Sequence, residues 1–430
     1  MAGPRPAGGV TAGPRPAGGV TAGKWFARQL AARTIGAVTD IAPRVEPFAL
    51  HTPRAALDDL RARLHATRWP NAPKDAGWSL GTDLAYLQEL VTYWADEFDW
   101  PAQEAALARL PHFRTVLGGL GIHFVQVRAT APSGSVLPLI LSHGWPDSFW
   151  RYTKVIPLLT DPGAHGADPA DAFDVVVPDV PGFGYSDHPT GEPLNSIDVA
   201  GLWAELMEVL GYPQFGAAGG DIGSHVSRYL ALDHPDRVVA VHRTDGGLPY
   251  NGLDPADLTP EEREWLTGAT AWGAAEGAYA AIHRTKPQTA AVGLNDSPAG
   301  LAAWIVEKLR AWSDCDGDVE RRFTKDEILT NITIYWLTET IGSSMRMYRA
   351  NSAIPPAQLA RRVEVPSGFS IFAGDVVRPP RAWLERTANT VRVTEPARGG
   401  HFAAFEEPEL YAEELREFFR PYRLATQSGG

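Results

Sequence analysis

The stretch FGAAGGDIG at residues 215–223 decides the fold, because it leads a short apolar run directly into a glycine-rich turn. Small residues lie two positions before and two positions after Asp221, where a sharp strand-to-helix turn has no room for side chains. Such a turn exposes its central side chain as a nucleophile, and a carboxylate needs no base to activate it. Aspartate also caps many helices, so the pentapeptide alone leaves a nucleophile and a helix cap as equal alternatives.

Short apolar runs alternate with helical patterns on both sides of this turn. A hairpin is expected between residues 113 and 127, with its turn at Gly118-Gly119. Strands that alternate with helices are typical of a mostly parallel sheet with helices on both faces, so the sequence predicts an α/β fold. The strands of that sheet are expected at residues 137–142, 174–177, 215–220, 368–372 and 391–394.

The N-terminal quarter of the chain divides into two segments. Residues 1–23 contain the repeat AGPRPAGGVT twice and predict a disordered tail, because glycine and proline leave too little apolar surface to bury. Residues 24–112 predict a helical meander, which begins with an amphipathic helix over residues 24–34. Further along this meander, Thr52 is expected to cap a helix whose first residue is a proline.

The rest of the chain predicts one sheet domain with an insertion. The first part of its core is expected at residues 113–250 and the second part at residues 364–424. Residues 251–363 are rich in helical patterns, and such an insertion late in an α/β chain is expected to form a helical cap over the carboxyl ends of the strands. Residues 425–430 form a C-terminal tail.

Composition limits the partners that the protein can have. The 430 residues carry a net charge of −12, which gives a nucleic-acid backbone no electrostatic attraction. The single cysteine, Cys315, excludes an intrachain disulfide and a cysteine-based metal site. No apolar run approaches the roughly 18 residues of a membrane-spanning helix. We therefore expect a soluble, cytoplasmic protein with no nucleic-acid partner, no membrane anchor, no cofactor and no metal.

Two further residues complete a candidate catalytic triad. His401 lies in GGHF at residues 399–402, after the last predicted strand, and Asp375 precedes it by 26 positions. The order Asp221, Asp375, His401 is the nucleophile–acid–histidine order of the α/β-hydrolase fold. Histidine titrates near neutrality and can take a proton from water, while a carboxylate partner fixes its tautomer. Asp245, in Thr-Asp-Gly after the strand that follows the turn, is a second position for the acid and stays open.

The sequence HGWP at residues 143–146 follows an earlier predicted strand. A loop at that place can bring the main-chain N–H of Trp145 beside that of Ile222, which makes an oxyanion hole. Pro146 has no main-chain N–H and therefore cannot donate to the oxyanion hole. A plain strand-to-helix turn is the alternative for this motif when it is considered alone.

These motifs together resemble the microsomal-type epoxide hydrolases of the α/β-hydrolase superfamily. The resemblance runs from about Phe48 to Tyr422. Its specific segments are HGWPDS at 143–148, PDVPGFGYSD at 178–187, GGDIGS at 219–224, TKPQT at 285–289, LNDSPAGLAAWIVEK at 294–308 and GGHFAAFEEP at 399–408. The resemblance implies a small-molecule epoxide substrate, which is converted to a vicinal diol through an alkyl ester on Asp221.

The resemblance also implies that the cap bears two tyrosines whose hydroxyls hold the epoxide oxygen. Matched to the family's pattern, the first falls on Tyr279, eight positions before Pro287, and the second on Tyr348 in Met-Tyr-Arg. A phenol can donate to the oxygen as negative charge develops there and can then protonate it. Tyr335 is a rival for either position. The resemblance does not include the membrane anchor that the vertebrate microsomal enzymes have.

Three other functions fit the sequence less well than epoxide hydrolysis. A haloalkane dehalogenase shares the aspartate nucleophile but typically has tryptophan after it, where this chain has Ile222. A carboxylesterase needs a serine at the centre of the turn, and a non-catalytic binding protein usually lacks members of the triad. The sequence leaves open the particular epoxide, a role in detoxification or secondary metabolism, and assembly as a homodimer.

Overall fold

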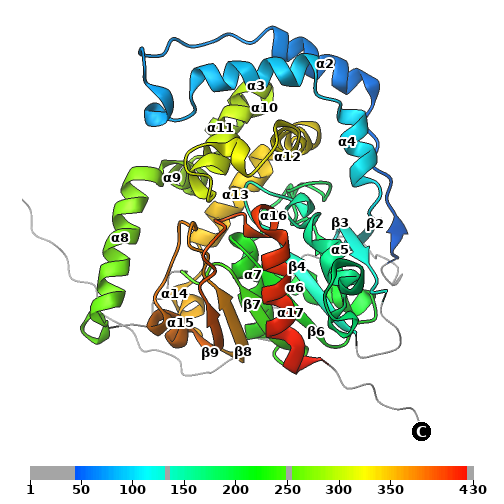
Figure 1. The fold of residues 1–430 in the computed structure, drawn as a ribbon, viewed down its shortest axis with the longest axis vertical. Helices are drawn as coiled ribbons and strands as arrows, with labels where there is room; N and C mark the ends of the chain where they lie inside the picture. The colour runs from blue at the N-terminus through cyan, green and yellow to red at the C-terminus, as the bar shows by residue number, and fades with distance from the viewer. Residues whose placement is uncertain (1–43, 131–135, 248–253, 424–430) are drawn as a thin grey trace, which may run out of the picture. The chain divides into compact units, whose positions relative to one another are not determined.

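The computed structural model describes residues 44–130, 136–247 and 254–423. The predicted tail at residues 1–23, the helix expected over residues 24–34 and the tail at residues 425–430 lie outside these ranges. Figure 1 shows the described chain with the labels that are used below.

A nine-stranded sheet runs through the described residues in the order β1-β2-β3-β5-β4-β6-β7-β8-β9. The pairs β1–β2, β2–β3 and β3–β5 are antiparallel, and every pair from β5 to β9 is parallel. This confirms the prediction of a mostly parallel sheet. The strands are β1 Glu46–Pro47, β2 His112–Leu117, β3 Leu120–Val127, β4 Leu137–Ser142, β5 Phe173–Pro178, β6 Phe215–Gly219, β7 Val238–Arg243, β8 Val363–Ser370 and β9 Ala388–Thr394.

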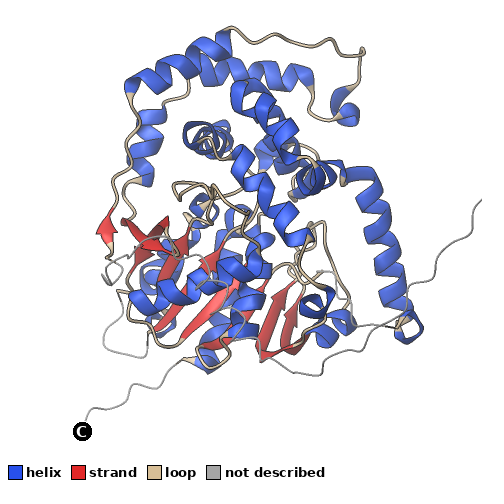
Figure 2. Cartoon of the chain, turned by 180° about the vertical axis from the view of Figure 1, so that it is seen from behind, coloured by secondary structure: helices blue, strands red, loops and turns tan. Residues whose placement is uncertain are grey.

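The central strands β4 and β6 are buried along their whole length, which explains why their sequences are continuous apolar or small-residue runs. Helices cover the sheet on both faces: α5 and α17 lie on one face and α6 and α7 on the other (Figures 1 and 2). Asn195 caps α6 through a capping box with Asp198. The helices that accompany the sheet are α5 Val155–Thr160, α6 Ser196–Val209, α7 Ile222–Asp233, α14 Pro356–Leu359, α15 Arg381–Thr387, α16 Ala403–Glu406 and α17 Pro408–Phe419.

A set of helices stands between β7 and β8 in the chain, where the sequence predicts the cap. Helices α9 and α10 both pack against α13, and α11 packs against α12. Figure 1 shows α9 to α13 beyond one end of the strands, whereas α8 runs down beside the sheet. Their bounds are α8 Pro260–Glu276, α9 Ala278–Thr285, α10 Pro287–Asp296, α11 Pro298–Trp312, α12 Lys325–Thr338 and α13 Ile341–Ser352.

The N-terminal helices pack on the helices of this insertion. They are α2 Arg54–His65, α3 Leu84–Asp96 and α4 Trp100–Leu107. Helix α3 contacts α11, and α4 contacts α12. Arg63 on α2 donates a 2.9 Å hydrogen bond to the carboxylate of Asp296 at the end of α10. The segment between β1 and β2 is therefore in contact with the insertion in the second half of the chain.

Two local predictions are wrong. Thr52 does not cap α2; its hydroxyl donates to the Glu104 carboxylate at 2.5 Å and accepts from the indole of Trp100 at 2.8 Å. Strand β8 covers Val363–Ser370 and not residues 368–372, with a register shift between Val363 and Pro366. Glu364 and Pro366 interrupt the apolar pattern there and conceal the beginning of the strand.

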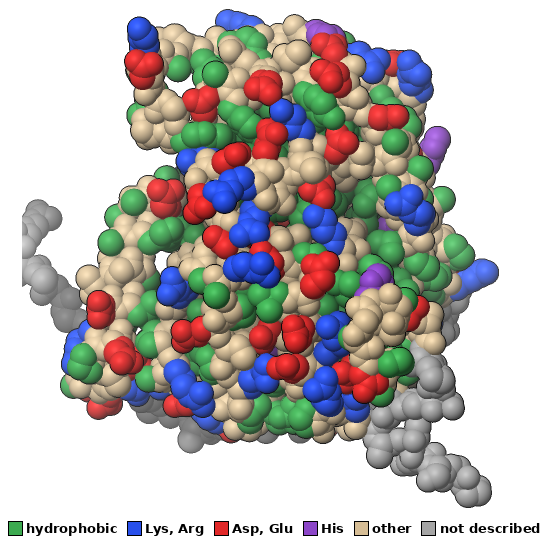
Figure 3. Space-filling model, in the orientation of Figure 1, with side chains coloured by type: hydrophobic (Ala, Val, Ile, Leu, Met, Phe, Trp, Pro, Cys, Tyr) green, Lys and Arg blue, Asp and Glu red, His purple; other side chains and the backbone are tan. Residues whose placement is uncertain are grey.

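The face drawn in Figure 3 carries acidic and basic side chains interspersed with one another. Exposed ion pairs of the described residues include Arg54 with Asp58 and Arg381 with Glu385. Across the described ranges, no helix combines the length and the apolar character that crossing a bilayer requires.

Candidate active site

Asp221 lies at the sharp turn between β6 and α7. Its backbone has φ 54° and ψ −132°, in the left-handed region that only a constrained turn imposes on a side-chain-bearing residue. A Cβ on Gly223 would collide with the main-chain carbonyl of Ser142, so this position requires glycine. The Asp221 side chain makes no capping bond to α7. Of the two alternatives for this residue, the helix cap is therefore excluded.

The Asp221 carboxylate is held by main-chain donors on one side and by histidine on the other. Its Oδ1 accepts a 2.8 Å hydrogen bond from the N–H of Trp145, and the amide of Ile222 also donates to the carboxylate. Its Oδ2 lies 3.4 Å from Nε2 of His401. Burial opposes ionisation, but His401 and the two amides outweigh it and lower the pKa of Asp221 to about 2. The carboxylate is ionised at neutral pH.

His401 is bound to Asp375, in the loop after β8. Nδ1 of the histidine lies 3.0 Å from Oδ1 of Asp375, which fixes the tautomer of a neutral ring. Burial alone would lower the pKa of His401, but Asp375 and Asp221 raise it to about 10. The main-chain N–H of His401 donates to the carbonyl of Trp312 at 2.8 Å. The base is thus held through both its ring and its backbone.

Asp245, the second candidate for the acid, is buried near the site but does not contact His401. Its Oδ1 accepts a 3.0 Å hydrogen bond from the amide of Gly247. Burial and the negative charge of Asp375 raise the pKa of Asp245 to about 6. The structure thus brings Asp375, and not Asp245, against the histidine.

Tyr279 on α9 and Tyr348 on α13 come together over the HGWP loop. Their ring centroids are 6.0 Å apart, and the ring of Tyr279 stacks on Trp145 at 5.4 Å. The Tyr348 hydroxyl is buried and interacts with the hydroxyl of Tyr279. Burial raises the pKa of both phenols, and the charge of Asp221 raises them further. Both hydroxyls therefore stay protonated at neutral pH.

Tyr335, the rival tyrosine on α12, has its hydroxyl engaged elsewhere. It donates a 2.9 Å hydrogen bond to the main-chain carbonyl of Asp147. On the same helix, the side-chain amide of Asn331 donates to the carbonyl of Pro146 at 2.8 Å. These two bonds fix the loop that carries Trp145 and leave the Tyr335 hydroxyl occupied.

His283 is a residue of the site that sequence reasoning missed. Its ring centroid lies 4.8 Å from that of Trp145 and 4.8 Å from that of Tyr348. The indole N–H of Trp304 donates to its Nε2 at 3.3 Å, and burial lowers the pKa of His283 to about 3. It is therefore a neutral ring that packs among the aromatic side chains. Its position one helical turn after Tyr279 is the signal that could have found it.

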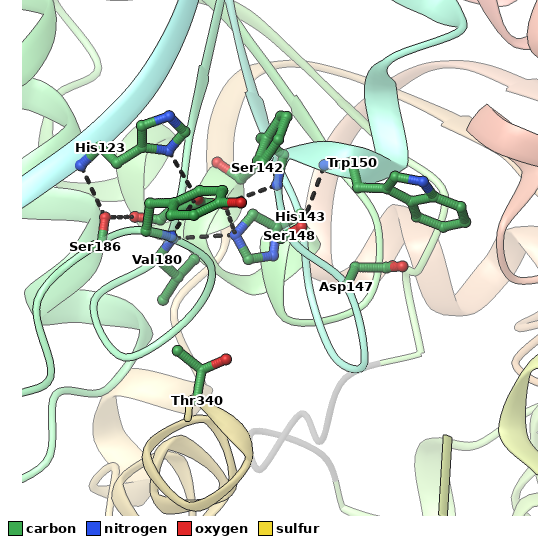
Figure 4. Close-up of polar contacts among 12 residues, drawn as sticks. His123, Ser142, His143, Asp147, Ser148, Trp150, Val180, Ser186 and Thr340 are labelled. Carbon is green, nitrogen blue, oxygen red and sulfur yellow. Dashed lines mark hydrogen bonds and ion pairs between the residues drawn. The ribbon is translucent and has the colours of Figure 1, made fainter. Parts of the chain in front are cut away.

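A buried polar network behind the HGWP loop was also missed. The carboxylate of Asp179 accepts from Nδ1 of His123 at 2.7 Å and from the amides of Phe149 and Tyr185 at 2.7 Å and 2.9 Å. Figure 4 shows His143 in this region, where its Nε2 accepts from the amide of Val180 at 3.0 Å. Asp179 lies in the PDVPGFGYSD segment, but nothing in that segment reveals the distant amides that it binds.

The site combines an ionised carboxylate, a histidine with a carboxylate partner, two main-chain amides and two phenols. Such a set can attack carbon, hold an oxyanion and move protons. In the described ranges, no group of three or more His, Cys, Asp or Glu side chains is arranged to hold a metal ion.

Two family models and several known proteins match this chain. The family model of the epoxide hydrolase N terminus matches residues 45–152, and the model of the alpha/beta hydrolase fold matches residues 138–270. The chain is 36% identical over 405 residues to epoxide hydrolase 1 of Sus scrofa, covering 87% of this chain and 88% of the relative.

Two solved structures share the fold over most of the chain. The juvenile hormone epoxide hydrolase of Bombyx mori superposes with a TM-score of 0.81 at 30% identity, covering 88% of this chain and 95% of that one. The epoxide hydrolase of Aspergillus niger gives 0.78 at 30% identity, with 88% and 97% covered. Fold and site thus define a hydrolase with the α/β-hydrolase fold. Within that class, the chain belongs to the epoxide hydrolase family.

Proposed function

We propose that this enzyme opens a small-molecule epoxide to a vicinal diol in two steps, with Asp221 as nucleophile, His401 as base and Asp375 as its acid partner. One observation carries the proposal: the Trp145 amide holds Oδ1 of Asp221, the Ile222 amide also donates to the carboxylate, and Oδ2 faces His401 at 3.4 Å. The carboxylate thus has one oxygen fixed by a main-chain donor and the other beside the histidine. Membership of the epoxide hydrolase family supports the choice of substrate class.

In the first step, Oδ2 of Asp221 attacks a ring carbon of the epoxide and the carbon–oxygen bond of the ring breaks. The electron pair of that bond becomes an alkoxide, which accepts a proton from the hydroxyl of Tyr279 or Tyr348. Solvent later restores the phenol's proton. Both hydroxyls are buried and remain protonated, so either can donate to this oxygen. The product is an alkyl ester of Asp221.

In the second step, His401 takes a proton from water, and the hydroxide attacks the carbonyl carbon of the ester. The negative charge develops on Oδ1, where the amides of Trp145 and Ile222 stabilise it. The ester bond then breaks, and the alcohol oxygen takes the proton from His401. Asp221 is left as the carboxylic acid and passes its proton to His401, which restores the resting ion pair. In the free enzyme Asp375 and Asp221 together hold the pKa of His401 at about 10; ester formation removes the charge of Asp221 and lowers this pKa, so that the histidine can lose its proton and act as a base.

One feature of the site would also serve halide displacement from a haloalkane. The indole N–H of Trp145 is buried without a hydrogen-bond partner in the described chain, and a halide could accept from it. Ile222, directly after the nucleophile, supplies no side-chain donor. The two phenols of the site fit an oxygen that needs a proton better than they fit a halide, so epoxide opening is the function that we favour.

A single turnover in oxygen-18 water tests the covalent step. Enzyme in excess over a small aryl epoxide should give a first diol with mostly unlabelled oxygen, while peptide mass spectrometry should find the label on Asp221. Water attacks the ester carbonyl in our mechanism, so the label enters the enzyme first. Heavy label in the first diol would mean direct attack of water on the epoxide. Release of bromide from a bromoalkane at a comparable rate would favour the alternative function.

A further inference from the structure

Arg151 is a fully enclosed cation beside the active site that the two-step mechanism does not use. It belongs to the 3-10 helix Phe149–Tyr152, directly after the HGWP loop, and its side chain is 2% exposed. Its counterion is Asp147 on the same loop, whose side chain is 0% exposed. Figure 4 shows Asp147 beside Ser148 and Trp150. Burying such a pair is costly, so its retention in the core calls for a reason other than stability.

The two ends of the guanidinium bind two different segments of the site. Nη1 donates to Oδ2 of Asp147, and Nη2 donates to the main-chain carbonyl of His401. The guanidinium carbon also lies 5.5 Å from the ring centroid of Phe402, over its face. Arg151 thus links the loop that supplies the Trp145 amide to the peptide that carries the base.

The turn of the nucleophile touches the same guanidinium. A Cβ built on Gly220, the residue before Asp221, would lie 2.9 Å from Nη2 of Arg151. The planar group therefore fits closely against the main chain of this turn. One side chain contacts the segments that present the nucleophile, the oxyanion-hole amide and the base.

The loop side of this link is itself fixed. The carbonyl of Asp147 accepts from the hydroxyl of Tyr335, and the carbonyl of Pro146 accepts from the side chain of Asn331. The loop that pairs with Arg151 is thereby fixed relative to helix α12 as well as to the sheet. A substitution of Arg151 should therefore displace mainly the backbone of His401, because the loop at Asp147 is held independently.

We propose that Arg151 is a positioning residue for the second half-reaction, which holds the His401 peptide so that the imidazole meets the ester on Asp221. This inference rests on the proposed function. Attack by Asp221 on the epoxide does not need proton transfer by His401, whereas ester hydrolysis does. Loss of the Arg151 link should therefore slow hydrolysis much more than alkylation.

The decisive variant is Arg151→Lys. A lysine ammonium keeps the positive charge and the pair with Asp147, but a single nitrogen on a thinner side chain cannot also span to the His401 carbonyl. We expect the hydrolysis rate to fall by about tenfold or more and the alkylation rate to change by less than about threefold. Because slower hydrolysis lets the ester accumulate, kcat and KM should fall in the same proportion, while kcat/KM stays nearly constant.

That kinetic signature separates positioning from a general structural defect. Loss of active protein lowers kcat and leaves KM unchanged, so kcat/KM falls. Intact-protein mass spectrometry during the steady state should also show a larger fraction of esterified enzyme in Arg151→Lys than in wild type. Arg128→Lys is the matched control: Arg128 pairs with Asp174 at 2.8 Å, is 61% exposed and should change neither rate.

A double variant keeps the test decisive if Arg151→Lys fails to fold. Asp147→Asn with Arg151→Gln removes both charges, so no buried charge is left unpaired. It should show the same selective loss of hydrolysis. Equal losses of alkylation and hydrolysis, or unchanged rates in a folded variant, would overturn the inference. Absence of any esterified enzyme in wild type would instead contradict the proposed function.

Discussion

The main-chain N–H of Trp145 donates a 2.8 Å hydrogen bond to Oδ1 of Asp221, so the candidate oxyanion hole is filled by the enzyme's own carboxylate before substrate arrives. This bond makes the two carboxylate oxygens inequivalent. Oδ1 stays in place through both proposed steps, and Oδ2 is left to form and release the bond to carbon.

Replacing the base should trap the covalent intermediate. In His401→Gln, Asp221 keeps its two main-chain donors and should still attack the epoxide, but no group takes a proton from water. Intact-protein mass spectrometry should show a stable adduct whose added mass equals that of the epoxide. Asp245→Asn serves as a comparison at the site and should leave no such adduct, because Asp245 does not contact His401. Normal turnover by folded His401→Gln would refute the role given to this residue.

The two phenols should contribute separately to alkylation. Tyr279→Phe and Tyr348→Phe each remove one hydroxyl and keep the ring packing against Trp145. Hydrogen bonds to a developing charge are worth about 1.5–3 kcal/mol, so each variant should lose roughly tenfold to 150-fold in the alkylation rate. The double variant should be slower still, as followed by quenching of tryptophan fluorescence.

Tyr335→Phe is the control for this pair, since the Tyr335 hydroxyl binds the Asp147 carbonyl. It should slow alkylation less than either variant above. A larger effect than that of Tyr279→Phe would assign the first donor to Tyr335. If none of the three hydroxyls affected the rate, epoxide opening assisted by phenols would be the wrong chemistry for this site.

The two half-reactions should differ in pH dependence. Asp221 has a pKa of about 2, so the nucleophile is ionised and the alkylation rate should be flat from about pH 5 to pH 8. Hydrolysis needs neutral His401, whose pKa of about 10 in the free enzyme falls once the charge of Asp221 is lost in the ester. The hydrolysis rate should therefore rise with pH and level off above the lowered pKa.

Rapid-quench experiments at a series of pH values separate these two rates. A hydrolysis rate that falls with rising pH would mean that the protonated imidazole is the active form. An alkylation rate that rises steeply over the same range would mean that the nucleophile is protonated in the free enzyme. Either outcome contradicts the assignment of charges at Asp221 and His401.

Removing Asp179 should destabilise the fold behind the HGWP loop. Asp179→Ala leaves the ring N–H of His123 and the amides of Phe149 and Tyr185 without their acceptor. Each buried donor left unpaired costs about 1–3 kcal/mol, so we expect the free energy of unfolding to fall by roughly 3 kcal/mol or more. Urea denaturation followed by circular dichroism measures it.

Asp59→Ala is the control for this substitution, because Asp59 makes an exposed pair with Arg63 on α2. It should lower the free energy of unfolding by at most about 1 kcal/mol. If Asp179→Ala lowered the free energy of unfolding by no more than Asp59→Ala does, water would be replacing the missing acceptor and the network would not hold the loop.

The parts of the fold that follow local rules could be predicted from the sequence. The Gly118-Gly119 turn, the continuous apolar run of β4 and the GGDIG turn each combine a pattern with its physical reason, and all are found where expected. The beginning of β8 was missed because Glu364 and Pro366 break the pattern, although register with β7 and β9 still holds the strand. Thr52 was misjudged because its partners lie about 50 residues away.

The candidate site likewise contains residues whose meeting the sequence predicts and contacts that it does not predict. Asp221, Asp375 and His401 follow strands in a characteristic order, and this order predicts that they meet. No local pattern connects Arg151 to a carbonyl 250 residues later, or Asp179 to the amide of Phe149. Such contacts depend on how the sheet and the insertion bring distant loops together. They are visible only in three dimensions.

The filled anion-binding position bears on which inhibitors could act on this enzyme. Boronic acids and trifluoromethyl ketones block serine hydrolases because the serine oxygen adds to them and the adduct places an oxygen against empty main-chain donors. Here the Trp145 amide already holds Oδ1 of Asp221, so such compounds would have to displace a carboxylate that the protein itself holds there. Amides and ureas, which offer a carbonyl to the phenols and an N–H to Oδ2, match the vacant half of the carboxylate instead. The hydrogen bond from Trp145 to Oδ1 of Asp221 thus favours the second group of inhibitors over the first.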